Sequence, residues 1–315
     1  MNRAWASLVH RASIVKRVAD WQQSPKDFLL HFQSGVYTCS RTIEGKIFNW
    51  DFHINRLVLG TFRQRDSTLS DKFMEEPEYI EISKRVENAF IRNLKVGMKD
   101  FSETFKDGNM RIYMVIENPG NSFTQCTEDD FMDYCWVYVQ CLPERGANEI
   151  ILTDVRVYER ENPEVKSIEW VKAKKTLESE LPKEKEEFIL AGGSKKNELY
   201  EGLSSNFFLL KNDKLYVAPE GTILTGTVMQ LVLQACSHLN IPVERKVPLI
   251  EDLDDCSGCF ISSTSRMVLP INKMFFPDHP NHIPEMVFEV PDKIKDIANY
   301  VRKELITAST DILSK

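Results

Sequence analysis

The stretch Glu201-Gly202-Leu203-Ser204-Ser205-Asn206-Phe207-Phe208 holds an acid, then small polar residues, then two aromatic residues. Glycine and serine are typical of tight turns, and Asn206 to Leu210 has the composition of a buried strand. The pattern therefore predicts an acid at a turn that enters a core strand. The adjacent glycine lets the backbone come close to a ligand. Taken alone, Glu201 is more simply explained as an exposed loop acid.

A lysine lies 35 residues before this acid (201 − 166), in Asn162-Pro163-Glu164-Val165-Lys166-Ser167-Ile168. This segment follows the predicted strand Ile150 to Tyr158. A lysine that reacts through its neutral amine must be held in place, and a position near a domain junction suits that requirement. Because other lysines follow closely, a solvated surface charge is the simpler explanation of Lys166 taken alone.

Three further segments are candidate anion-binding elements. Leu224-Thr225-Gly226-Thr227-Val228 begins a predicted helix, and the N–H groups and dipole at a helix N-terminus favour an anion. Ser262-Ser263-Thr264-Ser265 offers hydroxyl donors, and Arg56 in His53-Ile54-Asn55-Arg56-Leu57 offers a guanidinium. Each also has an ordinary explanation as a helix N-cap, a polar strand end or a surface arginine.

The remaining pattern predicts an α+β chain of two domains. Gly35 to Arg41 and Lys46 to Phe48 predict a hairpin that turns at Glu44-Gly45. Polar turn formers at Pro143-Glu144-Arg145-Gly146 predict the boundary between a domain of residues 1–143 and one of residues 147–315. Further strands are predicted at Met110 to Ile116, Cys135 to Cys141 and Lys214 to Val217, and further helices by Ile82, Val86, Ala89, Phe90 and Leu94 and by Ile294, Ala298, Val301 and Leu305.

Composition limits the class of partner. The chain has 315 residues, of which 42% are hydrophobic and 28% charged, with a formal net charge of −7 and no basic block. This distribution argues against a nucleic-acid surface, and no apolar run approaches the roughly 20 residues that cross a bilayer. We therefore expect a small charged metabolite as partner, with neither nucleic acid nor membrane.

The opening segment leaves two interpretations of location. Arg3, Arg11, Lys16 and Arg17 precede the first acid, Asp20, a composition also found in mitochondrial transit peptides. The helical spacing of Ile14, Val18 and Trp21 instead predicts a helix packed on its own domain. Seven cysteines, an odd number, fit a reducing compartment. We expect a cytoplasmic protein, with a mitochondrial one as the alternative.

Cys256 and Cys259 form a single C-x-x-C. Zinc would need two more ligands, and no second pair of cysteines or histidines stands at suitable spacing. We therefore expect no metal site, but a turn that leads into the buried strand Cys259-Phe260-Ile261.

The succession of motifs resembles the class IV, or fold-type IV, family of pyridoxal-phosphate enzymes. That family includes D-amino-acid aminotransferases, branched-chain aminotransferases and aminodeoxychorismate lyases. Its ordered motifs are "H-I-x-R-L", "x-K-S-x-x", "E-G-x-x-S-N-x-F", "L-x-G-T/I" and "S-T-S/T", matched here by His53–Leu57, the segment around Lys166, Glu201–Phe208, Leu224–Thr227 and Ser263–Ser265. The resemblance runs from about Gly35 to Leu269. It implies a small N-terminal α+β domain and a larger C-terminal domain that is β-barrel-like with helices.

The resemblance also implies pyridoxal 5'-phosphate as cofactor and assigns expected roles. Lys166 would hold the cofactor and transfer the proton, and Glu201 would keep the pyridine nitrogen protonated. The other expected cofactor-binding residues are Arg56, Ser205, Asn206, Gly226, Thr227, Val228, Ser263 and Thr264, and the expected substrate-binding residues are Tyr37 and Ser265.

We therefore expect a homodimeric aminotransferase that acts on an α-amino acid and a 2-keto acid. Two alternatives stay open. The first is a pyridoxal-phosphate lyase similar to aminodeoxychorismate lyase, which releases pyruvate without an amino acceptor. The second is a non-catalytic family member with a binding role, which the presence of both Lys166 and Glu201 disfavours.

Overall fold

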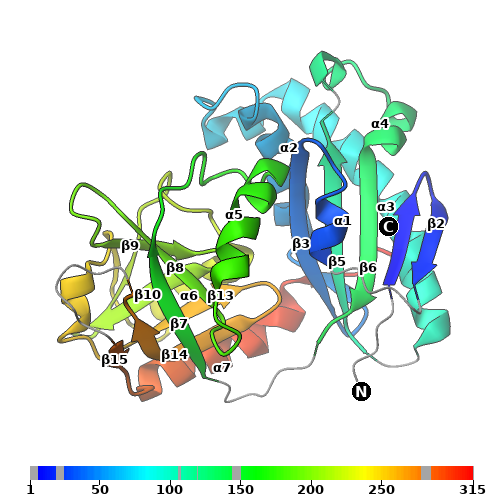
Figure 1. The fold of residues 1–315 in the computed structure, drawn as a ribbon. Helices are drawn as coiled ribbons and strands as arrows, with labels where there is room; N and C mark the ends of the chain where they lie inside the picture. Colours follow the sequence, from blue (N-terminus) through cyan, green and yellow to red (C-terminus); the bar gives the residue numbers. More distant parts are fainter. Residues whose placement is uncertain are drawn as a thin grey trace. The chain divides into compact units, whose positions relative to one another are not determined.

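The computed structural model describes residues 6–18, 25–105, 108–118, 120–143, 150–277 and 285–314 (Figure 1). The chain divides into two compact units. The first comprises Met1–Glu144, Val165–Lys172 and Leu305–Lys315, and the second comprises Arg145–Glu164 and Ala173–Glu304. The predicted boundary at Pro143 to Gly146 lies mostly outside the described residues. In the described ranges, no helix has both the length and the hydrophobicity that crossing a membrane requires.

The first unit is built on a seven-stranded sheet in the order β16-β4-β3-β5-β6-β1-β2. Its strands are β1 (Ala6–His10), β2 (Ser13–Val18), β3 (Gly35–Ile43), β4 (Lys46–Phe48), β5 (Met110–Glu117), β6 (Cys135–Cys141) and β16 (Ser309–Thr310). Its helices are α1 (Pro25–Leu29), α2 (Trp50–Arg63), α3 (Pro77–Thr104) and α4 (Glu128–Tyr134), with short 3-10 helices η1 (Asp71–Glu75) and η2 (Gly120–Ser122). Helices α2 and α3 bury an apolar core against the sheet.

Most predicted elements of this unit are confirmed. Strands β3 and β4 form the predicted hairpin, and Glu44 and Gly45 supply its turn with φ of 50° and 79°. The apolar stripe from Ile82 to Leu94 lies on α3, where Val86, Ala89 and Phe90 are fully buried. Strands β5 and β6 pair antiparallel over their whole predicted lengths.

The helix predicted in the opening segment is wrong. Residues 6–18 form the β1–β2 hairpin, which turns at Arg11 and Ala12 with φ of 49° and 50°. Two successive positive φ values give the hairpin turn whose twist matches its strands. A spacing of four residues fits one face of a strand as well as a helix, and pairing of β1 with β6 decides the outcome. Trp21 lies outside the described residues.

The second unit is built on a nine-stranded sheet in the order β12-β11-β10-β13-β14-β7-β8-β9, with β15 paired to β14. The strands are β7 (Ile151–Val157), β8 (Glu187–Gly192), β9 (Glu198–Gly202), β10 (Asn206–Lys211), β11 (Lys214–Val217), β12 (Val243–Arg245), β13 (Gly258–Ser263), β14 (Met267–Phe275) and β15 (Glu285–Val287). Because β9 also pairs with β10, the strands from β10 around to β9 close into a barrel. The expected barrel-like second domain is confirmed.

Helix α6 (Thr227–His238) packs in this unit, and η3 (Ile250–Leu253) is a short 3-10 helix. Gly226 is the N-cap of α6, so the helix begins where the sequence predicts. Helices α5 (Ile168–Glu180) and α7 (Asp292–Thr307) each contribute residues to both units. The strand predicted at Cys259 to Ile261 is confirmed within β13, where all three residues are buried.

Closure of the barrel occurs at the acid-bearing turn. Glu201 at the end of β9 faces Asn206 at the start of β10, and Gly202 N–H donates to the carbonyl of Ser205 at 2.8 Å. On its other side β10 pairs with β13, with Asn206 opposite Ser262. The turn between β9 and β10 therefore lies at the same end of the barrel as the hydroxyl-rich end of β13.

Candidate active site

Glu201 is a buried acid that is paired with a buried cation. Only 3% of the residue is exposed. Its Oε1 lies 2.7 Å from Nη1 of Arg160, and both side chains are less than a tenth exposed. Its Oε2 accepts a hydrogen bond from Leu224 N–H at 3.1 Å. The simpler explanation of Glu201 as an exposed loop acid is wrong, because a buried carboxylate needs such partners.

The Leu224 backbone links the acid turn to the segment that begins α6. Its N–H donates to Glu201, and its carbonyl accepts from Nδ2 of Asn206 at 2.6 Å. Gly226 packs close to this contact, because a Cβ placed there would lie 2.1 Å from Oδ1 of Asn206. The N–H and the carbonyl of one residue, Leu224, thus join two motifs that are separate in the sequence.

Two buried threonine hydroxyls lie at the N-terminus of α6. Oγ1 of Thr227, the first helical residue, lies 2.6 Å from Oγ1 of Thr264, which follows β13. Gly226 provides no side-chain cap, and the first N–H groups of a helix have no partner within it. Hydroxyls, backbone donors and a helix dipole together favour an anion of the size of a phosphate. Val228, the next residue, is also buried.

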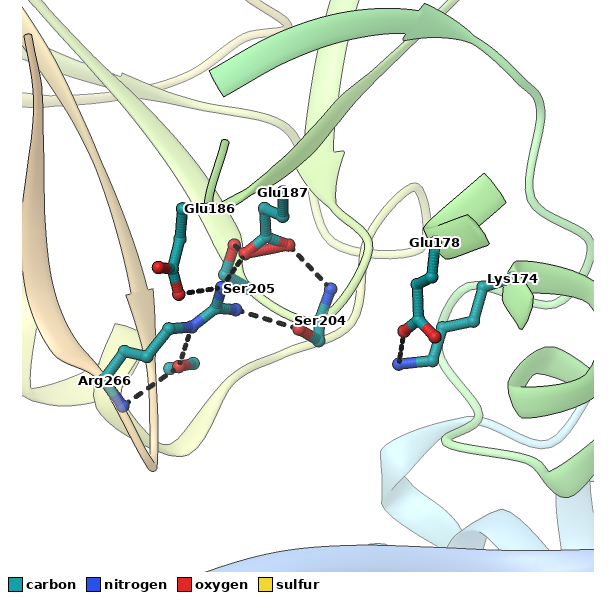
Figure 2. A network of polar contacts seen from close by, with 8 residues as sticks. Lys174, Glu178, Glu186, Glu187, Ser204, Ser205 and Arg266 are labelled. Atoms are coloured by element: carbon teal, nitrogen blue, oxygen red, sulfur yellow. Dashed lines mark hydrogen bonds and ion pairs between the residues drawn. The ribbon is translucent and has the colours of Figure 1, made fainter. Parts of the chain in front are cut away.

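Ser205 and Ser263 belong to a polar network that also contains Glu186, Glu187, Ser204 and Arg266 (Figure 2). Ser205 Oγ donates to Glu187 at 2.7 Å, and Arg266 Nε donates to Ser263 Oγ at 3.1 Å. Burial alone would lower the pKa of Arg266, but the carboxylates of Glu187 and Glu186 raise it. Ser265 is partly buried in the same turn after β13.

Lys166 lies in the first unit, beside the start of β3. Its carbonyl accepts from Tyr37 N–H at 2.9 Å, and Ser167 forms an isolated bridge with Val36. Its Nζ lies 5.0 Å from the centroid of the Tyr37 ring. Lys166 is partly buried and Tyr37 is buried, so the main chain and one aromatic face fix the position of the lysine.

His53 and Arg56 belong to the same unit, on α2. His53 is completely buried, and its Nδ1 lies 2.7 Å from Oγ1 of Thr38. Its Nε2 has no hydrogen-bond partner among the described residues. Burial, together with the positive charges of Arg56 and Lys166, lowers the pKa of His53 well below its usual value. The surroundings of His53 thus favour its uncharged form.

The predicted site residues form two groups. Most of the cofactor-binding set is brought together in the second unit by contacts that connect Glu201, Leu224, Thr227 and Thr264. Lys166, Tyr37 and Arg56 lie in the first unit. Sequence analysis missed Arg160, Glu187 and Arg266. For the two arginines, the available signal is that a buried acid requires a cation, and that rule does not say which of the 40 lysines and arginines supplies it.

Known proteins share both the fold and the sequence pattern. The solved structure of a putative branched-chain amino acid aminotransferase from Thermotoga maritima is 19% identical, with a TM-score of 0.64 over 94% of this chain and 96% of that chain. The pyridoxal-phosphate-bound form of a hypothetical aminotransferase from Mycobacterium tuberculosis is 14% identical, with a TM-score of 0.67 over 96% and 99%. These likenesses show the fold.

The sequence relatives match over shorter stretches. A probable branched-chain-amino-acid aminotransferase of Thermotoga maritima is 31% identical over 94 residues, which are 28% of this chain and 34% of that protein. A D-alanine aminotransferase of Bacillus licheniformis is 33% identical over 75 residues, which are 24% and 26%. The matched stretches therefore span only about a quarter to a third of these two relatives' lengths.

A family model matches over a longer range than these relatives. The model of amino-transferase class IV covers residues 35–274, more than half of the chain and nearly the range over which the motifs were recognised. The chain therefore belongs to the class IV aminotransferase family.

Proposed function

We propose that this protein is a pyridoxal-phosphate-dependent aminotransferase that transfers an amino group between an α-amino acid and a 2-keto acid. The observation that carries the proposal is the buried Glu201 carboxylate, held by Arg160 and by Leu224 N–H two residues before the N-cap of α6. The cofactor, when bound, supplies a protonated pyridine ring that stabilises negative charge at the substrate α-carbon.

The residues of the second unit fit the two ends of this cofactor. A buried carboxylate can accept a hydrogen bond from the pyridine nitrogen and keep it protonated. The threonine hydroxyls and backbone donors at the start of α6 can bind the phosphate, and Gly226 leaves the space that a Cβ would take from Asn206. Asn206 supports the acid turn through its bond to the Leu224 carbonyl, and Ser205, Val228 and Ser263 are further candidate cofactor contacts.

Lys166 supplies the amine and the proton-transfer group in this proposal. Its Nζ lies 5.0 Å from the centroid of the buried Tyr37 ring, and the main-chain bonds of Lys166 hold the segment beside β3. Arg56 is the candidate charge-assisted phosphate ligand from the first unit, and Tyr37 and Ser265 are candidate substrate contacts. Retention of the whole set supports a catalytic protein over a binding protein.

The experiment combines cofactor binding with turnover. We expect purified protein incubated with pyridoxal phosphate to turn yellow, and borohydride to fix the cofactor only when Lys166 is present. Lys166→Ala should abolish turnover, because the residue both holds the cofactor and moves the proton. A protein that ignores added pyridoxal phosphate contradicts the proposal. Pyruvate release without a keto acid would indicate a lyase instead.

We also propose that the protein is a cytoplasmic homodimer. The dimer is proposed from the resemblance to class IV enzymes, which are generally homodimers. The cytoplasmic location is proposed from the odd number of cysteines, each a free thiol here. Light scattering after gel filtration tests the dimer, and cell fractionation tests the location. A monomer, or enrichment in the mitochondrial fraction, would contradict the respective proposal.

A further inference from the structure

An ionic cluster around the buried side chains of Arg266 and Glu187 joins the two turns that frame the candidate site in the second unit (Figure 2). We call it the Arg266 cluster; it comprises Glu186, Glu187, Ser204, Ser205, Ser263 and Arg266. Arg266 lies in the turn between β13 and β14, and both serines 204 and 205 lie in the turn between β9 and β10. The cluster therefore bridges two segments that are about 60 residues apart in the sequence.

Glu187, the first residue of β8, binds the turn between β9 and β10, which follows Glu201 and which we call the acid turn. Its Oε2 accepts from Ser204 N–H at 2.9 Å, and its Oε1 accepts from Ser205 Oγ at 2.7 Å. Only a glycine fits at position 202, because a Cβ there would lie 2.4 Å from Glu187 Oε2 and 2.3 Å from Ser205 Oγ. The glycine next to Glu201 thus makes room for the carboxylate that binds the turn.

Arg266 binds Glu187 and also forms hydrogen bonds to both turns. It forms an ion pair with Glu187, lies 3.2 Å from Glu186, and donates through Nη2 to Ser204 Oγ at 2.9 Å. Its Nε and its backbone N–H both donate to Ser263 Oγ, at 3.1 and 3.3 Å. A guanidinium is suited to this task because its five donors have a fixed, planar arrangement.

The cluster is a costly way to obtain stability alone. Its arginine side chain is 9% exposed and Glu187 is 4% exposed, and an apolar packing of the same volume is often as stable as a buried ion pair. Beyond stability, the cluster fixes the position of one turn relative to the other, because its hydrogen bonds reach both turns. One turn begins at Glu201, and the other contains Thr264.

We propose that Arg266 and Glu187 are positioning residues that keep the carboxylate of Glu201 and the hydroxyl of Thr264 at a fixed separation. The proposal rests on the function proposed above, in which these groups bind the two ends of one rigid cofactor. In this proposal Arg266 and Glu187 act on cofactor binding through the two turns that they hold, without themselves contacting the cofactor.

The first test needs no cofactor. Hydrogen exchange of the amides in residues 201–206 and 262–266 should become at least about tenfold faster in Arg266→Gln and Glu187→Gln, because each variant removes a charge-assisted bond to a turn. The matched control is Asp154→Asn, which breaks another buried ion pair of the same unit, Asp154 with Lys185 at 3.3 Å. Exchange in both turns should stay at the wild-type rate in this control.

The second test is a titration with pyridoxal phosphate, followed by its visible absorbance. Affinity should fall about tenfold or more in Arg266→Gln, the size expected for losing a charge-assisted hydrogen bond, and the pH dependence of the absorbance should shift. Asp154→Asn should bind as the wild type does. Arg266→Lys, which keeps the charge and loses the fork, should fall between wild type and Arg266→Gln.

The outcomes separate the two proposals. Wild-type protein that does not bind pyridoxal phosphate overturns the proposed function, whereas unchanged exchange in both turns overturns the positioning role whatever the cofactor does. If Arg266→Gln does not fold, Glu187→Gln and Arg266→Lys carry the same measurements. Equal loss of affinity in Asp154→Asn would show general destabilisation and would also overturn the positioning role.

Discussion

The segment around Lys166 and the turn after Glu201 are held in place by different kinds of interaction. Lys166 is fixed through its main chain, by the hydrogen bond from Tyr37 N–H and the bridge at Ser167. Glu201 is fixed through its side chain, by Arg160 and Leu224 N–H, inside the second unit, whose strands form the barrel and which we call the barrel unit. We therefore expect replacement of the partly exposed lysine side chain to disturb the fold less than replacement of the buried acid.

The largest effect on the free energy of unfolding is expected at Glu201. Glu201→Gln removes the carboxylate charge that faces buried Arg160, and disrupting one partner of a buried ion pair costs about 3–5 kcal/mol. Lys166→Ala should lower the free energy of unfolding by less than about 1 kcal/mol, as is usual for partly exposed side chains. Urea denaturation of the cofactor-free variants measures both values.

The control for this prediction removes both charges. Glu201→Gln with Arg160→Met should recover most of the lost free energy of unfolding, since an apolar replacement of a buried pair is often neutral. Recovery of stability without recovery of cofactor binding separates the structural contribution of the acid from its chemical one. Equal destabilisation by Glu201→Gln and Lys166→Ala would contradict the comparison.

A smaller effect is expected at Gly226, which tests how tightly the acid turn and the start of α6 fit together. In Gly226→Ala the new Cβ would lie 2.1 Å from Oδ1 of Asn206, so the buried amide must move and weaken its bond to the Leu224 carbonyl. Overpacking of this kind costs about 1–3 kcal/mol. The urea midpoint measures the loss.

The companion variant is Gly226→Ala with Asn206→Ala, which removes the clashing atom together with its hydrogen bond. We expect the second substitution to cost little once the first is present, because both act on the same contact. Strictly additive losses would show that the two side chains are not in contact, and would contradict the close fit described for this turn.

How much the sequence predicts depends on the range of the interaction. The β3–β4 hairpin, α3, the start of α6 and the turn at Glu201 follow from local patterns of turn formers and apolar spacing, and all four are confirmed. These features need only neighbouring residues, and their signals are therefore complete within a short window.

Features that depend on distant partners were not predictable in the same way. The opening hairpin forms because β1 pairs with β6 more than a hundred residues later, and this pairing overrides an ambiguous spacing. Arg160 and Arg266 become part of the site through ion pairs that span 41 and 79 residues. No local pattern marks one arginine among many as buried, so these residues required the structure.

The next effect is a dependence of stability on pH, and it concerns His53 in the first unit. The pKa of His53 is lowered by burial and by Arg56 and Lys166, so the unfolded chain binds more protons in acid than the folded chain does. Stability should therefore be complete above the usual histidine pKa of 6.5 and should fall below it, by about 1.4 kcal/mol for each pH unit until the folded pKa is reached.

His53→Gln tests this dependence, because glutamine can keep a hydrogen bond to Thr38 and does not titrate. We expect the free energy of unfolding of the variant to change less between pH 6.5 and lower pH than that of the wild type. The measurement is a series of urea titrations across that range. Parallel pH profiles for the two proteins would show that other groups cause the acid sensitivity.

The smallest expected effect compares two buried threonines of the barrel unit. Thr264→Val removes the hydroxyl that lies 2.6 Å from Thr227, and loss of one hydrogen bond in a buried pair costs about 1 kcal/mol. Thr153→Val removes a buried hydroxyl that has no hydrogen-bond partner among the described residues, so it should be neutral or stabilising. The two substitutions are chemically identical and differ only in the partner of the hydroxyl. If both variants have the same urea midpoint and the same affinity for pyridoxal phosphate, the hydroxyl pair at the start of α6 contributes neither to the fold nor to anion binding. Phosphate binding in the second unit would then depend on the backbone donors at the start of α6.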